Sequence, residues 1–249
     1  MIDEDLKKVR VKKQPGRHLT KDQIRKRRVR ALLFAQKVSD GNEQYVLTID
    51  KALLSYDHSN GQTNFYYTEK EIEDRLQDPP LKAGAAQFPK NVMFAAGFTH
   101  RGPTKFYHIP PKTKMTAELF VEKVLTPMLF EDVPRLYGKE AHKVVLHMDS
   151  APSHTARKTT EWLDANGFKY ISKEEWLPYS PELAPMDFFA NGYLKSKLKR
   201  RQYKTLDGML RCAKDEWNKI PLELFQKALA SWSKRVLAVH KARGKYVSL

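Results

Sequence analysis

An apolar segment that ends abruptly at an aspartate is the feature that most constrains the fold of this chain. Residues 143–148, KVVLHM, have the β-branched and apolar side chains of a buried strand, and Asp149 follows them directly. Ser150 and Ala151 lead to Pro152, which suits the first turn of a helix because its missing N–H needs no partner there. The sequence therefore predicts a strand-to-helix junction with a carboxylate at the end of the strand.

Two strands and a helix are expected before this junction. Residues 91–100, NVMFAAGFTH, and 104–110, TKFYHIP, predict paired strands joined by a turn. Thr116 then caps a helix with a single apolar stripe. A strand, a helix and a strand in this order favour a right-handed crossover, which lays the strand at 144–149 parallel to an earlier one. The stripe consists of Val121, Val124, Leu125, Met128 and Leu129.

The first strands also end in acids. The segments QYVLTID, ALLSYD and TNFYYTE, within residues 44–69, predict a meander of strands. Asp50 ends the first segment and Asp57 the second, but the turn sequence Asp-His-Ser-Asn-Gly explains Asp57 without chemistry. We expect Asp50 and Asp149 at the C-terminal ends of adjacent strands. A long polar, proline-bearing loop is expected at about residues 57–90.

The second half of the chain is expected to be mainly helical. Residues 154–166 predict a helix with an Asn-Gly stop, and FKYIS predicts a short strand. The loop at 174–187 contains three prolines and hands over to a helix from 186 to about 200. Glu182 suits a turn acceptor in this loop. Two amphipathic helices follow, with apolar stripes at Leu206, Leu210, Ala213, Trp217 and Ile220, and at Phe225, Ala228, Leu229, Trp232 and Val236.

Positive charge is concentrated at the start of the chain. The sequence has 45 Lys and Arg against 29 Asp and Glu, a net charge of +16, and 12 of these basic residues lie in the first 30. This excess suits a polyanion such as nucleic acid, and a merely soluble basic protein is the alternative. Thr20 is expected to cap a basic helix at residues 21–38, whose thin apolar face, with Ile24, Leu32 and Phe34, docks on another element.

A second basic run lies beside the proline loop. Residues 193–204, YLKSKLKRRQYK, carry six Lys and Arg and no acid. The run predicts a track for a DNA backbone, and a solvated helix face is the alternative. The residues expected to bind DNA are Lys12, Lys13, Arg17, Arg25, Arg27, Arg28, Lys195, Lys197, Lys199, Arg200 and Arg201.

Cysteine usage and hydropathy limit the compartment. Cys212 is the only cysteine, so the chain cannot form an intramolecular disulfide or a cysteine zinc site. We expect a reducing compartment, and any metal should be held by oxygen or imidazole. The sequence pattern predicts an intracellular, soluble protein without a signal peptide and without a membrane partner.

Three acids in this arrangement fit one kind of chemistry. Two divalent ions roughly 4 Å apart, bridged and flanked by carboxylates, can activate the attacking and the leaving oxygen of a phosphodiester. Asp50 and Asp149 would meet on adjacent strands, and Asp187 would join them from the first turn of its helix. Each acid alone is more often a turn former or a cap, so the prediction depends on the joint arrangement.

Two longer motifs carry a family resemblance. HMDSAPSHTA, residues 147–156, and YSPELAPMDFFANGYLKSKL, residues 179–198, resemble the catalytic signatures of the Tc1/mariner superfamily of DNA transposases. YVLTIDKALLSYD, residues 45–57, is similar to the family's first motif. The resemblance covers about residues 10–249. It implies an α/β fold with a ribonuclease-H-like mixed sheet flanked by helices.

The resemblance also implies the site and its cofactor. Asp50, Asp149 and Asp187 would be the catalytic residues and would bind two Mg²⁺, with Mn²⁺ as a substitute. The 37 residues between Asp149 and Asp187 match the branch of the superfamily with three aspartates. The implied activity is metal-dependent DNA cleavage and strand transfer, the cut-and-paste transposition that integrates DNA at TA targets.

The same resemblance implies partners and domains. The expected partners are transposon terminal inverted repeats, TA target DNA and a second copy in a homodimer, and the expected compartment is the nucleus. Family members usually begin with paired helix-turn-helix modules, and this chain is expected to start at their linker. The expected domains are a basic arm and helix at 1–40, a ribonuclease-H-like catalytic domain at 41–204 and C-terminal helices packed on it at 205–249. The loop at about 57–90 would reach the partner subunit.

Some residues depart from the family pattern or keep two interpretations. Ser150 stands where Asn is usual, Lys51 where Glu is common and Ala190 where Trp is frequent. Ser150 and His154 are candidate supports for the metal ligands; His154 could donate to a phosphate or a carboxylate, or simply cap and pack. His147 is interpreted as a core histidine. The alternatives to a transposase are a catalytically inactive DNA-binding remnant, domesticated or truncated, and a simple nuclease of the same fold.

Overall fold

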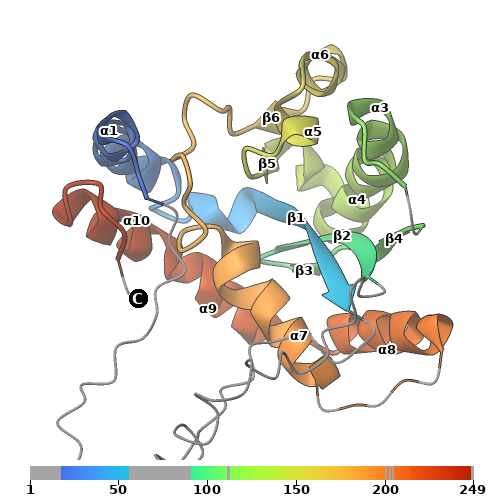
Figure 1. Cartoon of the computed structure of the whole chain (residues 1–249). Coiled ribbons are helices and arrows are strands. Elements are labelled where there is room, and N and C mark those ends of the chain that lie inside the picture. Colours follow the sequence, from blue (N-terminus) through green and yellow to red (C-terminus); the bar gives the residue numbers. More distant parts are fainter. Residues whose placement is uncertain are drawn as a thin grey trace, which may run out of the picture.

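A single mixed sheet organises the part of the chain that the structure describes. The computed structural model describes residues 18–55, 91–110, 113–199, 201, 203 and 205–247. Within these residues six strands run in the order β3-β2-β1-β5-β6, and β4 also pairs with β2. Helices lie on both faces of the sheet (Figure 1), which confirms the predicted α/β class. The strands are β1 (Val46–Ser55), β2 (Asn91–Thr99), β3 (Gly102–Pro103), β4 (Tyr107–Ile109), β5 (Val145–His147) and β6 (Lys169–Tyr170).

Strand β1 is longer than the sequence predicted. The segments QYVLTID and ALLSYD were expected to form two strands, yet β1 runs unbroken from Val46 to Ser55. The reason is that β2 supplies antiparallel partners from Thr48 through Ser55. Parallel pairing with β5 covers only Val46 to Thr48. Asp50 therefore lies in the middle of β1 and beyond the end of β5, and its prediction as a strand end is wrong.

A helical crossover covers one face of the sheet. Thr116 caps it as predicted, because its hydroxyl accepts the Leu119 N–H at 3.2 Å. The stripe residues Val124, Leu125, Met128 and Leu129 are buried against this face. β5 then runs parallel to β1, as the crossover requires. The crossover consists of α3 (Ala117–Phe120), two π-helical segments (Val121–Leu125 and Met128–Asp132), α4 (Val133–Tyr137) and a 3₁₀ segment (Gly138–Lys143).

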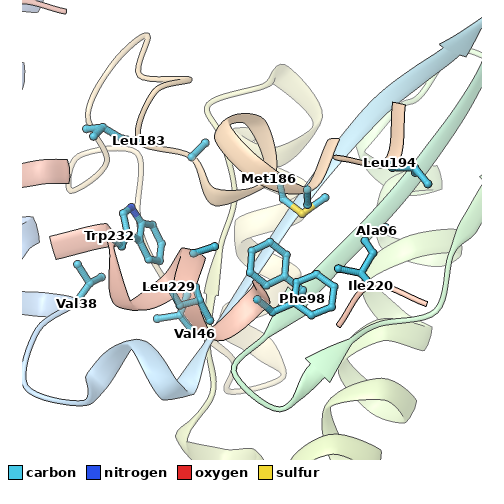
Figure 2. Packing of buried hydrophobic residues seen from close by; sticks show 14 of the residues in the cluster. Val38, Val46, Ala96, Phe98, Leu183, Met186, Leu194, Ile220, Leu229 and Trp232 are labelled. Carbon is cyan, nitrogen blue, oxygen red and sulfur yellow. The ribbon is translucent and has the colours of Figure 1, made fainter. Parts of the chain in front are cut away.

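A second apolar core lies on the other face. Figure 2 shows Phe98 and Val46 of the sheet packed with Leu194, Leu229 and Trp232 of the covering helices. These interior side chains supply the burial that stabilises the fold. The helices on this side are α1 (Lys21–Lys37), α7 (Asn191–Lys199), α8 (Leu206–Asn218), α9 (Leu222–Ala230) and α10 (Trp232–Lys241).

Two predicted helices are each divided in the structure. The last amphipathic helix is α9 and α10, separated at Ser231, whose hydroxyl donates to the Ala228 carbonyl at 2.8 Å and competes with helical bonding. The helix predicted at 154–166 is α5 (Pro152–Thr155) and α6 (Arg157–Ala165), because Ala156 has an extended backbone with ψ of 141°. The apolar stripe predicted for the last helix is buried across α9 and α10, so its period was predicted correctly and its continuity was not.

Helix α1 docks on α10 through a thin apolar face, as predicted. Thr20 and Gln23 form a capping box at its start. Ala31 and Phe34 are buried, whereas Leu32 is 44% exposed and lies off the docked stripe. Within the described ranges the structure contains no helix long and apolar enough to cross a membrane. The TNFYYTE segment and the loop predicted at about 57–90 lie outside the described residues.

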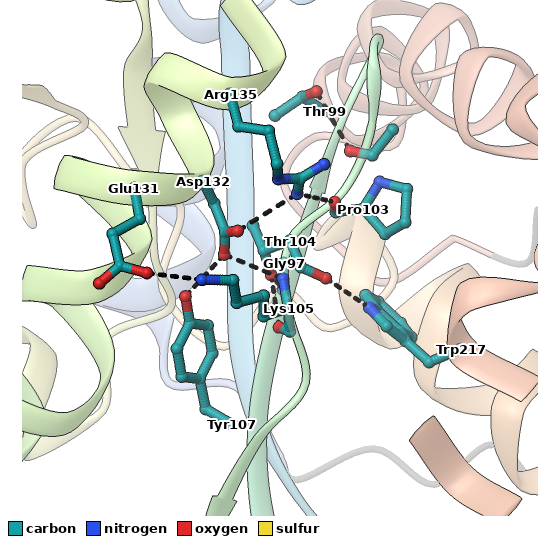
Figure 3. Close-up of polar contacts among 11 residues, drawn as sticks. Gly97, Thr99, Pro103, Thr104, Lys105, Tyr107, Glu131, Asp132, Arg135 and Trp217 are labelled. Carbon is teal, nitrogen blue, oxygen red and sulfur yellow. Dashed lines mark hydrogen bonds and ion pairs between the residues drawn. The ribbon is translucent and has the colours of Figure 1, made fainter. Parts of the chain in front are cut away.

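A buried carboxylate ties the crossover to the first strands of the sheet (Figure 3). Asp132 Oδ2 accepts the Lys105 N–H at 2.9 Å and the Tyr107 hydroxyl at 2.6 Å. Its Oδ1 lies 3.2 Å from the Arg135 guanidinium. Nearby, Trp217 Nε1 donates to the Thr104 carbonyl at 2.9 Å and attaches α8 to the segment between β3 and β4. The network holds both helical layers to the edge of the sheet.

This network predicts a large effect at Asp132. Asp132→Ala leaves the Lys105 N–H and the Tyr107 hydroxyl without an acceptor, so we expect a loss of about 2–4 kcal/mol in the free energy of unfolding. Urea denaturation followed by far-UV circular dichroism measures it. The neighbouring Glu131→Ala removes only an exposed ion pair with Lys105 and should leave the midpoint unchanged. Equal losses in the two variants would contradict this role.

Candidate active site

Three aspartates from three separate elements meet beyond the end of β5. Asp149 follows β5 by two residues, and Asp187 lies in a π-helical segment (Met186–Ala190) that leads into α7. Both line one groove of about 640 Å³. Asp50 on β1 lies close enough for the charges of the other two to raise its pKa. The fold thus brings together the three acids that the sequence singled out.

Asp50 is the most strongly perturbed of the three. Burial raises its pKa to about 7, and the charges of Asp187 and Asp149 add to the shift. Two donors oppose this effect: the Lys51 N–H at 2.7 Å and the Asn191 amide at 2.8 Å. The Asp50 carboxyl is therefore partly protonated at neutral pH.

The pKa of Asp187 is also raised, although this residue is more exposed than Asp50. Burial of its carboxyl raises the pKa to about 6, and the charge of Asp149 adds to this. Lys195 and Asn191 act in the opposite direction. Because the residue as a whole is exposed to the groove, solvent screens part of this repulsion.

Asp149 is the acid that stays ionised. Its burial alone would raise the pKa, but His154, the Ala151 N–H at 3.0 Å and Lys51 outweigh burial and hold the pKa below its ordinary value. His154 Nδ1 lies 2.5 Å from Asp149 Oδ1, and this contact is the main one that lowers the pKa of the carboxyl. The structure thus places His154 beside Asp149, while Ser150 is exposed in the groove.

His154 is held in a buried, apolar setting. Burial lowers its pKa although Asp149 raises it, so the imidazole is neutral at physiological pH. Its ring lies 4.5 Å from that of Phe120, centroid to centroid. Of the two interpretations of His154 from the sequence, its position favours support of a carboxylate.

Lys51 is a site residue that the sequence analysis noted only as a departure from the family pattern. Its ammonium donates to Ser153 Oγ and lies 5.3 Å from the centroid of the Phe120 ring. Burial lowers its pKa, and Asp149 and Asp50 act against this. The position directly after Asp50 was the only signal for a cation here.

Two polar residues that the sequence analysis kept apart from the three acids, His147 and Glu182, have structural roles. His147 Nδ1 lies 3.0 Å from Thr48 Oγ1, and its ring is packed between Trp176 and Trp232, as expected of a core histidine. Glu182 forms an ion pair with Arg27. Asp57 lies outside the described residues.

Arg27 corrects one of the predicted DNA contacts. Its side chain is fully buried, pairs with Glu182 and donates to the Tyr179 and Gly244 carbonyls, each at 2.8 Å. Helical periodicity explains the difference, because Arg27 falls on the docked stripe with Ala31. On the following turn of the same helix, Arg30 Nη1 donates to the Lys173 and Trp176 carbonyls.

The other predicted DNA contacts are distributed over two surfaces. Arg25 and Arg28 are exposed on α1, and Lys197 and Lys199 are exposed on α7, where Lys195 is half-buried. Arg201 forms an ion pair with Glu216. The remaining candidates, Lys12, Lys13, Arg17 and Arg200, lie outside the described part of the chain.

The donor set fits a divalent cation in chemistry, although a complete metal site is not assembled. Carboxylate and amide oxygens suit Mg²⁺ or Mn²⁺. Asn191 Oδ1 is buried beside this cluster and has no hydrogen-bond partner among the described residues. Over the same residues, no group of three or more His, Cys, Asp and Glu side chains lies in position to hold an ion. The carboxylates would have to draw together around a cation.

The raised carboxyl pKa values predict a pH effect on stability. A carboxyl whose pKa is higher in the folded than in the unfolded state binds more protons in the folded state between the two pKa values. The free energy of unfolding therefore falls as pH rises through this range. For Asp50 this window runs from its ordinary pKa of 3.8 to the raised pKa of about 7. We expect the unfolding free energy without metal to fall across it, and Asp50→Asn to raise that energy at pH 8 by about 1–2 kcal/mol.

Thermal denaturation at a series of pH values in EDTA measures this effect. The exposed Asp215→Asn on α8 is the matched control and should keep the slope of the wild-type protein. An Asp50→Asn protein with the same slope as the control would show that repulsion among the three acids is not felt in solution.

Adjacent arginines on α1 give a second test. Arg27→Met leaves Glu182 without its partner in a largely buried position, so we expect a loss of about 3–5 kcal/mol. The exposed Arg28→Met should leave the unfolding midpoint unchanged. Chemical denaturation of both proteins compares them, and a mild Arg27→Met phenotype would disprove the anchoring role.

Known proteins that resemble this chain include Mos1 transposases. No family model matches the chain. The Mariner Mos1 transposase of Drosophila mauritiana is 30% identical over 81 residues, which are 32% of this chain and 22% of that protein. The alignment thus spans about a fifth of the curated relative.

Solved structures are similar over nearly the whole chain. A pre-cleavage Mos1 transpososome matches with a TM-score of 0.80 at 18% identity, covering 97% of this chain and 68% of that one. The catalytic domain of Mos1 mariner transposase matches with a TM-score of 0.71 at 15% identity, covering 94% of this chain and 100% of that one. The chain therefore has the ribonuclease-H-like fold of the Mos1 catalytic domain, which is the fold that the motif resemblance implied.

Proposed function

We propose that this chain is the catalytic domain of a DNA transposase that cleaves DNA and transfers the cleaved strand to a target. The observation that carries the proposal is the convergence of Asp50 from β1, Asp149 from just after β5, and Asp187 from the π-helical segment before α7. Bringing three carboxylates together destabilises the fold through charge repulsion. A catalytic role for these carboxylates explains why the fold retains this arrangement.

The three aspartates would hold two Mg²⁺, or Mn²⁺ in their place. The ions, when bound, supply activation of the attacking oxygen and stabilisation of the leaving oxygen. Asp149 is ionised before any ion arrives, because His154 and Lys51 keep its pKa low. Asp50 and Asp187 would release protons on binding, since a cation favours their charged forms. Structures of Mos1 complexes with Mn and with Mg support this choice of ions.

DNA would lie along the groove that leads away from Asp149 and Asp187. Lys26, Arg30 and Lys173 line this groove and supply positive charge for phosphates. Lys195 and the exposed lysines of α7 extend the basic surface on the other side of Asp187. A similar structure, the Mos1 paired-end complex, contains a left transposon end, which supports DNA as the partner.

The finer expectations follow from the resemblance. The substrate would be transposon terminal inverted repeats and a TA target, and the working unit would be a homodimer on DNA. The compartment would be the nucleus. A water molecule and then the freed 3′ hydroxyl would be the successive nucleophiles, so one acidic site serves cleavage and joining.

A DNA-binding remnant without catalysis is the second candidate. It is favoured by Lys51, whose ammonium lies beside Asp50 and Asp149 where it competes with a metal ion. It is also favoured by the lack of a ready metal site over the described residues. Such a protein would bind DNA through its basic surfaces in a salt-dependent way, with or without divalent ions.

A strand-transfer assay distinguishes these functions. It combines a pre-cleaved oligonucleotide with a Mos1-type transposon end, a supercoiled plasmid, and Mg²⁺ or Mn²⁺. We expect joined product from the wild-type chain and a loss of more than about 100-fold in Asp149→Asn, because even outer partners of metal ligands change activity 10–100-fold. Asp215→Asn, on the exposed face of α8, is the control.

Each result selects one function. Joined product that disappears in Asp149→Asn supports the transposase. Nicking without joining indicates a simple nuclease of the same fold. DNA binding without nicking or joining under either metal, equal in the wild-type and Asp149→Asn proteins, indicates the remnant.

A further inference from the structure

Asn191 occupies a special place at the start of α7. It lies one helical turn after Asp187, at a spacing of four residues, and only 7% of it is exposed. Its backbone N–H bonds to the Met186 carbonyl, which makes the preceding turn a π-helical one. π-Helical turns inside helices often occur at functional sites. Here the turn places the Asp187 and Asn191 side chains toward the same cluster.

The Asn191 amide connects two of the three acids. Its Nδ2 donates to Asp50 Oδ2 at 2.8 Å. The same side chain lies near enough to Asp187 to lower the pKa of that carboxyl. An amide nitrogen carries two hydrogens, so one group can donate to both carboxylates. Asn191 therefore joins β1 to α7 across the site.

The other end of the same amide is unused. Asn191 Oδ1 is buried and has no hydrogen-bond partner among the described residues. A buried acceptor without a partner destabilises the folded state. The planar amide that holds this oxygen is bonded to Asp50, so the oxygen itself lies at the acidic cluster. A hydrogen-bond acceptor next to carboxylates that repel one another destabilises the fold. The same oxygen atoms are suitable ligands for a cation.

We propose that Asn191 is an additional oxygen ligand of the divalent ion that Asp50 and Asp187 bind, and that it positions these two carboxylates while the ion is absent. This inference rests on the metal site of the proposed function. Amide oxygens are ordinary ligands of hard divalent cations. Because the oxygen and nitrogen of an Asn amide exchange places by a half-turn, the same side chain can serve both states.

Manganese binding tests the proposal without any catalytic readout. Electron paramagnetic resonance of free Mn²⁺ gives the dissociation constant for the full-length wild-type chain and for its variants. We expect Asn191→Leu, which keeps the size and loses both polar atoms, to weaken Mn²⁺ binding about 10–100-fold. Asn191→Asp keeps an oxygen ligand and should bind Mn²⁺ at least as tightly as the wild-type chain. The exposed Asn218→Leu on α8 is the control.

The two substitutions separate a ligand from a purely structural residue. A residue that acts only as a donor between carboxylates would make Asn191→Asp bind Mn²⁺ as weakly as Asn191→Leu, and that result overturns the proposal. Unchanged binding in Asn191→Leu overturns it as well. Circular dichroism of each variant shows whether it is folded.

A measurement on the wild-type chain removes the dependence on folded variants. In a ¹H–¹⁵N spectrum, the Asn191 side-chain amide signals, assigned by their absence in Asn191→Asp, should shift during an Mg²⁺ titration with the same midpoint as binding. Signals that stay fixed through saturation overturn the proposal.

The same data separate this inference from the proposed function. Wild-type binding of Mn²⁺ with normal binding in Asn191→Leu rejects the ligand and leaves the transposase proposal intact. A wild-type chain that binds no Mn²⁺ removes the metal site on which both depend.

Discussion

The unequal pairing of β1 is the constraint on which the rest of the site depends. β2 pairs with β1 over eight residues, Thr48 to Ser55, whereas β5 pairs with it over three, Val46 to Thr48. The sheet therefore opens beside Asp50, and the chain leaving β5 turns into this opening with Asp149. The opening can be filled only by polar groups, since the carboxylates there must keep contact with water or a cation. The π-helical segment before α7 adds Asp187 to the same cluster.

Gathering three acids in this opening has a physical cost that the surrounding residues partly offset. Asp50 and Asp187 have raised pKa values, while Asp149 stays ionised. The offsetting groups are of three kinds: the neutral imidazole of His154, the ammonium of Lys51 and the amide of Asn191. A divalent ion would replace all of this with direct attraction. Perturbed carboxyls of this kind are typical of sites selected for chemistry rather than for stability.

Local patterns in the sequence predicted the elements well and the contacts between them poorly. Asp149 and Asp187 were found because each follows a strong local signal, a strand broken by proline and a proline loop before a helix. The continuity of β1 depends on β2, some forty residues later, and no local pattern carries it. Arg27 looked like any other basic residue, because its carbonyl partners come from residues near 179 and 244. Asn191 lies four residues after Asp187, a spacing that places both on one helical face. Only the hydrogen bond to Asp50 shows that this face belongs to the site.

The basic helix α1 supports the loop that presents Asp187, whereas the sequence predicted only that it docks on another element. The loop that presents Asp187 contains three prolines, so it lacks several of the N–H groups that would otherwise pair its carbonyls. Arg27 and Arg30 supply donors to those carbonyls at Lys173, Trp176 and Tyr179. The outer face of the same helix carries the exposed Arg25 and Arg28. Support of the Asp187 loop and exposed positive charge therefore belong to one helix, so any change that displaces α1 would disturb both.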